Sequence, residues 1–258
     1  MNYYYKQKLF GDLVSVLKGM VGFHQTFEKW MEEAGLNITD TQFKKLTQYV
    51  DLLKKKNEEL NLTSITDPKE VWIKHILDSL ITVPFFKIKP GMKVMDVGTG
   101  GGLPGIPLAI MFPSVQFVLI DSTQKKITAV EEFVKELGLK NVACIATRAE
   151  TIAHHPSHRD QYDLVLTRAV APLRVLIELT VPLIHLYGNA IAYKGPEYIS
   201  ELSQSQNAII KLKSEPPRVY QYSLPEGMGN RTIIQITKKH VTPDVYPRRE
   251  GIPNKRPL

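Results

Sequence analysis

The residues best suited to bind a ligand form a glycine-rich run between Asp96 and Gly105, with the sequence DVGTGGGLPG. The run follows a short apolar stretch typical of a buried strand and precedes a stretch typical of a helix. Glycines let the backbone approach a ligand closely and adopt positive φ, and free N–H groups at a helix start favour a negative group. Because open α/β sheets bind ligands at the carboxyl ends of their strands, we expect a ligand at this turn.

Two classes of cofactor fit the glycine spacing. Gly100, Gly102 and Gly105 give G-x-G-x-x-G, which predicts a dinucleotide site and an NAD-dependent oxidoreductase. From Asp96, the run also gives D-x-G-x-G-x-G through Gly98, the pattern of an S-adenosylmethionine loop. A carboxylate here would repel a pyrophosphate and attract the ammonium and sulfonium charges of S-adenosylmethionine. The residues therefore favour S-adenosylmethionine and leave the dinucleotide as the alternative.

Three further strand ends carry polar groups that would face the same cleft. Asp121 lies 23 residues beyond Gly98, where a carboxylate can accept hydrogen bonds from ribose hydroxyls or cap the following helix. The third strand ends in TRAE, residues 147–150, which would flank an adenine ring. Arg168 ends the fourth strand and could clamp a carboxylate or a phosphate, or pair with Glu150 or Asp121.

Other polar groups allow a functional and a plain interpretation. His75 and Asp78 lie three residues apart on a predicted helix. They either face the cleft or RNA, or form a pair that orients the helix, and we favour the pair. Lys194, at the end of the fifth strand, is either a phosphate contact or a surface lysine. The histidines within residues 154–158 lack a cysteine or carboxylate at ligand spacing, so we expect no metal there.

The elements that position these residues follow from the apolar periodicity. Stripes at helical spacing, with breaks at Gly35 and at Asp67-Pro68, predict a helical N-terminal subdomain over residues 23–90 after an extension at 1–22. Residues 91–240 alternate strands and helices, which predicts an α/β domain with a mostly parallel sheet. Its last two strands, joined by residues 225–230, predict an antiparallel hairpin. The expected strands are 93–97, 116–120, 142–146, 163–167, 189–193, 218–224 and 231–238, and the expected helices of the α/β part are 105–112, 124–137, 172–186 and 197–213.

Composition and charge limit the protein class. A single cysteine, Cys144, excludes an intrachain disulfide framework and fits a reducing compartment such as the cytoplasm. No secretory signal is evident, and the uncharged run 97–120 contains eight Gly or Pro residues, so we expect no membrane span. Ten basic and four acidic residues fall between Lys211 and Leu258, which places six of the seven net positive charges there. The basic tail at 241–258 is therefore either a nucleic-acid contact or a solvated extension.

The motifs taken together resemble the bacterial small-subunit rRNA guanine-N7 methyltransferases, the RsmG or glucose-inhibited division protein B family. The resemblance extends from about Asn61 to Leu258, and the order of its motifs is more specific than the glycine loop alone. Residues 1–20 and the 154–158 histidine segment depart from the family pattern without touching its motif positions. The matching segments are NLTSI (61–65), HILDSL (75–80), the 96–107 loop, Asp121-Ser122, RAE (148–150), TRAVA (167–171), Lys194-Gly195 and YPRR (246–249).

The resemblance implies a class I S-adenosylmethionine-dependent methyltransferase fold, Rossmann-like, behind a helical N-terminal region. It implies methyl transfer from S-adenosylmethionine to N7 of a guanine in the 530 loop of 16S rRNA. We also expect a monomer that acts on the small ribosomal subunit without a metal or a membrane. A non-catalytic RNA-binding ribosome-assembly protein on the same fold stays open as an alternative. Carried over by position, the cofactor-binding residues are Gly98, Leu103, Asp121, Ser122, Thr123, Ala149, Glu150 and Arg168.

The chemistry of that reaction agrees with the residues present. N7 of guanine carries a lone pair and no proton, so the attack needs no general base. Alignment and electrostatics would then supply most of the rate enhancement, and no catalytic residue is assigned. Methylation at carbon 5 of cytosine would need a cysteine nucleophile, and Cys144 is predicted to lie mid-strand in the core.

Overall fold

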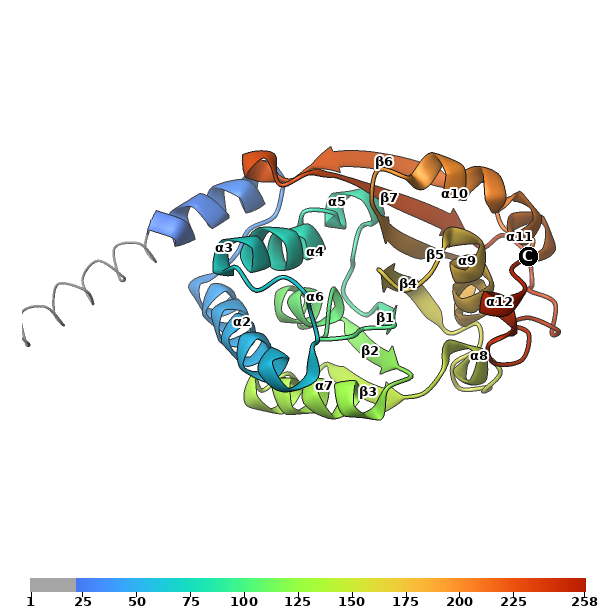
Figure 1. The fold of residues 1–258 in the computed structure, drawn as a ribbon, viewed down its shortest axis with the longest axis horizontal. Helices are drawn as coiled ribbons and strands as arrows, with labels where there is room; N and C mark the ends of the chain where they lie inside the picture. Colours follow the sequence, from blue (N-terminus) through green and yellow to red (C-terminus); the bar gives the residue numbers. More distant parts are fainter. Residues whose placement is uncertain (1–21) are drawn as a thin grey trace, which may run out of the picture.

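The computed structural model describes residues 22–258, so the predicted extension, apart from Gly22, lies outside the described residues. Within them, seven strands form one sheet in the order β3-β2-β1-β4-β5-β7-β6 (Figure 1). The first five strands are parallel, and β7 runs antiparallel between β5 and β6, as the sequence predicts. The bounds are β1 Lys93–Val97, β2 Gln116–Asp121, β3 Val142–Ala146, β4 Tyr162–Arg168, β5 Ile184–Lys194, β6 Arg218–Ser223 and β7 Asn230–Thr237.

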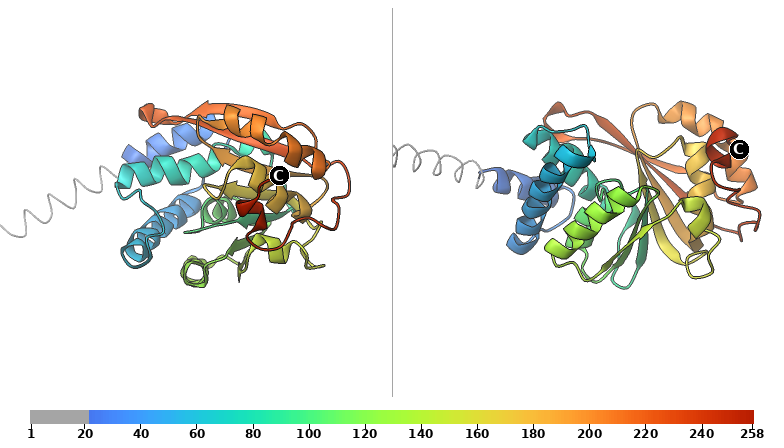
Figure 2. Two further views of the ribbon diagram at one scale, coloured as in Figure 1. Left: turned by 45° about the vertical axis from the view of Figure 1, so that its right-hand side comes forward. Right: turned by 60° about the horizontal axis from the view of Figure 1, so that its bottom comes forward.

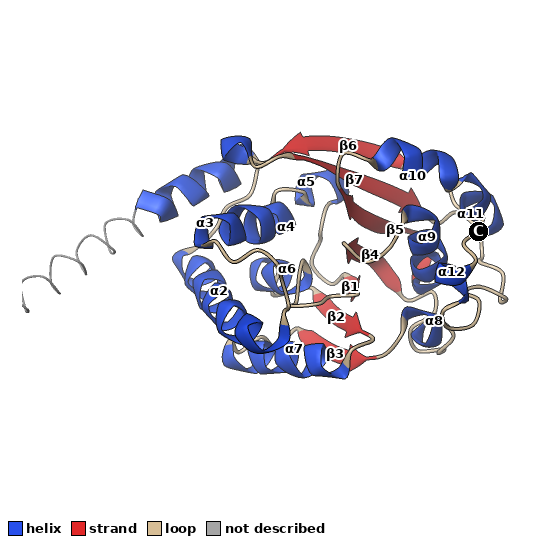
Figure 3. Ribbon diagram, in the orientation of Figure 1, coloured by secondary structure: helices blue, strands red, loops and turns tan. Residues whose placement is uncertain are grey.

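Helices cover both faces of the sheet (Figures 2 and 3). One face carries α6 (Gly105–Met111) and α7 (Gln124–Glu136), with the N-terminal helices packed outside them. The other face carries α8 Ala149–Ile152, α9 Leu173–Thr180, α10 Tyr198–Gln204, α11 Gln206–Lys211 and α12 Ile252–Lys255. Neighbouring residues of β1 show the two-sided burial, since Val94 packs toward α6 and α7 and Met95 toward α9.

Two predicted helices end or break early. The helix expected at 172–186 stops at Thr180, because a short 3-10 turn, Val181–Leu183, leads directly into β5. The helix expected at 197–213 is divided at Ser205, whose hydroxyl donates to the carbonyl of Glu201 at 2.6 Å. Such local hydroxyl bonds compete with regular helix geometry.

The helical N-terminal region packs onto the sheet domain through one shared hydrophobic cluster. Residues 22–33 are helical, and α2 (Asp40–Leu60) begins with the capping box between Thr39 and Gln42. Asp67 caps α3 (Pro68–Val71), which continues as a π-helix, η1 (Trp72–Leu77), and then α4 (Asp78–Leu80) and α5 (Val83–Phe86). Among the residues described, no helix is both long enough and apolar enough to cross a membrane.

The basic segment, residues 241–258, is not the free solvated extension that its composition suggests. Its backbone folds back over α8 and α9 toward the carboxyl ends of the strands (Figure 1). Thr242, Pro247 and Pro253 are buried within it. The segment is thus part of the folded domain, because groups beneath it supply partners that composition alone does not reveal.

Candidate functional site

A cavity of about 600 Å³ opens at the carboxyl ends of β1, β2 and β4, a size typical of ligand sites. Six of the predicted cofactor residues line it: Gly98, Leu103, Asp121, Ser122, Thr123 and Arg168. The other two, Ala149 and Glu150, line a smaller adjoining cavity of about 110 Å³ that shares Gly98 and Asp121 with the first. The fold therefore gathers the predicted set around two connected spaces.

The glycine loop requires glycine for conformation and for space. Gly98 has a φ of +72°, and a Cβ placed there would lie 2.6 Å from Cγ2 of Val170. Asp96 lies beneath the loop, fully buried, and its Oδ2 accepts from Thr99 Oγ1 at 2.7 Å and from the Gly105 N–H at 3.0 Å. Burial raises the pKa of Asp96 to about 6. Asp96 does not line the cavity, so it shapes the loop instead of meeting a ligand charge directly as the sequence suggested.

Asp121 is held in place at the end of β2 by two backbone groups. Its Oδ2 accepts from the Gly100 N–H at 3.1 Å, and its Oδ1 accepts from the Thr123 N–H at 2.8 Å. Each carboxylate oxygen can accept a second hydrogen bond, so both remain able to accept from a ligand hydroxyl. The same bonds fix the turn before α7, so the ribose and turn-capping interpretations are compatible.

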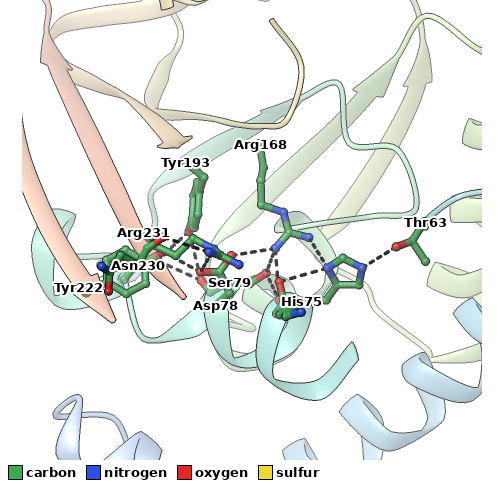
Figure 4. Close-up of polar contacts among 11 residues, drawn as sticks. Thr63, His75, Asp78, Ser79, Arg168, Tyr193, Tyr222, Asn230 and Arg231 are labelled. Atoms are coloured by element: carbon green, nitrogen blue, oxygen red, sulfur yellow. Dashed lines mark hydrogen bonds and ion pairs between the residues drawn. The ribbon is translucent and has the colours of Figure 1, made fainter. Parts of the chain in front are cut away.

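Arg168 reaches a partner that the sequence did not identify. Its guanidinium lies 3.5 Å from Oδ2 of Asp78 and 3.4 Å from Oγ of Ser79 (Figure 4). A second guanidinium nitrogen lies 3.4 Å from Nδ1 of His75. The expected pairing with Glu150 or Asp121 is wrong; the side chain instead joins the cavity to the helix that carries His75 and Asp78. The side chains of His75 and Asp78 are not bonded to each other in the described structure. The Asp78 N–H donates to the His75 carbonyl, and each side chain contacts Arg168.

Burial sets the charge state of this cluster. Burial, and next the positive charge of Arg168, lower the pKa of His75 to about 3, so the ring is neutral at ordinary pH. Its Nε2 lies 2.7 Å from Oγ1 of Thr63, which also lines the cavity. Burial raises the pKa of Asp78, and Arg168 opposes that rise. His75 belongs to the π-helix η1, and such segments are frequent at functional sites.

The antiparallel hairpin supplies two more residues to the cluster. Tyr222 of β6 donates from its hydroxyl to Oδ1 of Asp78 at 2.7 Å, and Nε of Arg231 lies 3.9 Å from the same oxygen (Figure 4). Sequence reasoning missed Thr63, Ser79, Tyr222 and Arg231. Thr63 and Ser79 lie inside motifs noted from the sequence, but no local pattern connects residues 222 and 231 to a carboxylate more than 140 positions earlier.

The loop after β4 closes over the glycine loop. Ala169 adopts a φ of +56°, and Val170 lines both cavities. Lys194 holds this loop, because its Nζ donates to the carbonyl of Ala171 at 2.8 Å and pairs with Glu201 at 2.7 Å. Lys194 is therefore not the plain surface lysine that the sequence allowed, and its contact with a phosphate stays a prediction.

A profile of the family described as rRNA small subunit methyltransferase G matches residues 42–230. A ribosomal RNA small subunit methyltransferase G from Geobacillus sp. (strain WCH70) is 39% identical over 90% of this chain and 98% of that protein. The protein of the same name from Halalkalibacterium halodurans is 41% identical with the same coverage. The chain belongs to the rRNA small subunit methyltransferase G family. The resemblance predicted from the ordered motifs is confirmed.

Two solved structures support the fold of this family member. A SAM-dependent methyltransferase from Aquifex aeolicus aligns with 72% of this chain and 97% of its own, with a TM-score of 0.50 and 19% identity. A SAM-dependent O-methyltransferase from Thermotoga maritima aligns with 73% and 72%, with a TM-score of 0.50 and 14% identity. At such identities the likeness concerns the fold alone, and it confirms the expected class I methyltransferase fold.

The histidines near residue 154 have structural partners in this family member. His154 Nε2 lies 2.7 Å from the carbonyl of Pro247, and His158 Nδ1 lies 2.6 Å from the Tyr162 hydroxyl. A different group, on the helical region, brings potential metal-ligand atoms within 4.8 Å of one another: those of His24, Glu28 and Asp40. None of these three lines the cavity, and the absence of a metal requirement stays a prediction.

Proposed function

We propose that this family member transfers a methyl group from S-adenosylmethionine to N7 of a guanine in the 530 loop of 16S rRNA. The observation that carries the proposal is the coincidence of family membership over nine-tenths of the chain with a glycine-walled cavity at the carboxyl ends of the strands. The dinucleotide alternative finds no support in the relatives, whose name is that of a methyltransferase.

The residues around the two cavities fit S-adenosylmethionine. Gly98 leaves room that a Cβ would fill, so a ligand can pass close to the backbone. Asp121 would accept from the ribose, the 149–150 backbone would flank adenine, and Arg168 would pair with the carboxylate of the methionine part. When bound, S-adenosylmethionine supplies an electrophilic methyl group on a sulfonium centre.

The protein's own groups would position the guanine and control charge. His75 is neutral, so the positive charge on this wall of the cavity is that of Arg168. Asp78, at 3.5 Å, and the carboxylate of the methionine part would offset that charge where the purine would become cationic. No residue needs to remove a proton from N7. Burial raises the pKa of Cys144 to about 12, which argues against a thiolate nucleophile and against carbon-5 methylation.

The decisive experiment is methylation of ribosomal RNA from a strain that lacks the homologous enzyme. Purified protein and labelled S-adenosylmethionine are incubated with small subunits and, separately, with naked 16S rRNA. We expect label in RNA and, by mass spectrometry, 7-methylguanosine in the 530 loop. Binding of S-adenosylmethionine without transfer to either RNA would favour the non-catalytic assembly protein. Light scattering during gel filtration tests the expected monomer.

A further inference from the structure

The basic segment is anchored by two side chains of the α/β domain, the partly buried Arg159 and the fully buried Glu178. The guanidinium of Arg159 donates to the carbonyls of Thr242 at 3.2 Å and Tyr246 at 2.9 Å. The guanidinium of Arg248 pairs with Glu178, whose side chain is fully buried. These contacts fix the path of residues 242–248 and therefore the place that the following residues occupy.

That place borders the smaller of the two site cavities, which Asn254 lines, and a separate cavity of about 840 Å³, which Arg249, Glu250 and Ile252 line. The N–H of Gly251 donates to Oε1 of Glu150 at 3.0 Å, and Thr151 and Arg148 both contact the carboxylate of Glu250. One turn later, Asn254 lines the cavity together with Gly98, Asp121, Ala149 and Glu150. One oxygen of Glu150, a residue expected from the sequence to flank the adenine ring, is therefore already bonded to the segment.

We propose that Asn254 is an additional cofactor-binding residue that recognises the adenine ring of the methyl donor. The inference rests on the proposed function, because it takes the small cavity for the adenine end of the S-adenosylmethionine site. A carboxamide carries a donor and an acceptor side by side, and asparagine matches the amine and ring nitrogen of adenine in this way. Three neutral polar side chains line the cavity, those of Ser122, Thr147 and Asn254, and Asn254 is the carboxamide among them. One oxygen of Glu150 is already occupied.

The arrangement couples cofactor binding to the order of the basic segment. If adenine binds Asn254, the bound state holds α12 against the domain, and by linkage a well-seated α12 strengthens binding. The positive segment would then serve the cofactor site as well as any RNA contact. This coupling gives the proposal a readout that does not depend on methyl transfer.

The test uses the full chain and S-adenosylhomocysteine as the probe. Titration calorimetry compares wild type with Asn254→Ala and with Lys255→Ala, a control on the next exposed residue, which is absent from the cavity lining. We expect Asn254→Ala to weaken binding about tenfold, or about 1.4 kcal/mol, and Lys255→Ala to leave it unchanged. Trypsin cleavage after Arg249 and Lys255, followed by mass spectrometry, should slow when the probe saturates wild type and slow less in Asn254→Ala. Thermal melting confirms that each variant is folded.

The outcomes distinguish a failure of the proposed function from a failure of the inference about Asn254. Absence of binding to wild type refutes the proposed function and the inference with it. Binding to wild type with equal affinity for Asn254→Ala overturns the inference alone, whatever trypsin shows. Equal weakening in both variants also overturns it, because the effect would then be one of the segment and not of the carboxamide.

Discussion

Arg248 is expected to stabilise the fold, whereas its neighbour Arg249 is not. Nε and Nη2 of Arg248 donate to the two oxygens of Glu178 at 2.8 and 2.7 Å, and its backbone N–H donates to Oε1 at 2.8 Å. Glu178 is fully buried on α9. The hydrogen bonds to the carboxylate of Glu178 also raise the pKa of Arg248, so the guanidinium stays charged. Arg249 is exposed on the same segment.

The size of the effect follows from the charge that would be left behind. Breaking a buried pair by removing one partner costs about 3–5 kcal/mol, because the other charge stays uncompensated. Arg248 is about a quarter exposed, so we take the lower end, roughly 3 kcal/mol. For a chain of this length that corresponds to a fall in Tm of roughly 6–12 °C in Arg248→Ala. Arg248→Met combined with Glu178→Gln should recover much of the loss, because no buried charge remains.

Urea unfolding and thermal melting measure the loss of stability. RNA binding at several salt concentrations tests whether the segment contacts RNA phosphates. Arg249→Ala should melt like wild type and should flatten the salt dependence if the segment contacts RNA phosphates. Arg248→Ala should lose stability, and Arg248→Met with Glu178→Gln should keep the wild-type salt dependence. Melting temperatures of Arg248→Ala and Arg249→Ala that agree with each other would refute the reasoning and return the segment to a free basic arm.

Four further predictions test the site. The native pKa of His75 is about 3 while an unfolded histidine titrates near 6.5, so the unfolded state binds the extra proton. The free energy of unfolding should therefore fall as pH drops from about 6.5 to about 3. The fall should be steeper than in His75→Gln by up to about 1.4 kcal/mol per pH unit. If urea unfolding gives the two proteins the same dependence of this free energy on pH, the prediction is wrong. Gly98→Ala should reduce the affinity for S-adenosylhomocysteine, measured by calorimetry, at least about tenfold. Gly138→Ala is the control, because Gly138 has a similar φ of +61° but lies in open space, and it should not change the affinity. Equal affinities of Gly98→Ala and wild type would show that the glycine loop does not hold the ligand. Cys144→Ser should retain the methylation rate, and its loss would reopen a thiol mechanism. Methylation should survive EDTA, and a loss restored by a divalent cation would show a metal requirement.

The sheet could be predicted because its signals are local. Each parallel strand is a short apolar run bounded by turn residues, and the predicted bounds of β1 and β3 agree with the structure to the residue. The capping box at Thr39 and the proline after Asp67 likewise mark helix starts by local hydrogen bonding. β5 begins five residues earlier than expected, because α9 already ends at Thr180 and the 3-10 turn Val181–Leu183 leads directly into the strand.

The predicted cofactor residues could be grouped from the sequence because strand ends meet at one edge of a parallel sheet. The partners of these residues could not be predicted from the sequence. Arg168 pairs with Asp78, 90 positions earlier, and Glu150 bonds to Gly251, 101 positions later. Pairings of this kind depend on how layers pack, and no period or motif in the chain encodes them.

Positive charge in the basic segment has two distinct uses, and only structure distinguishes them. Arg248 neutralises Glu178, which lies beneath the segment. This pair fixes where Gly251 and Asn254 lie. The exposed arginine beside it is left for solvent or RNA. A count of basic residues treats the two alike, although one acts on the fold and the other on association. Because Arg248 anchors the segment that carries Asn254, loss of Arg248 should weaken cofactor binding even at temperatures where the protein stays folded. Arg249→Ala should not do so.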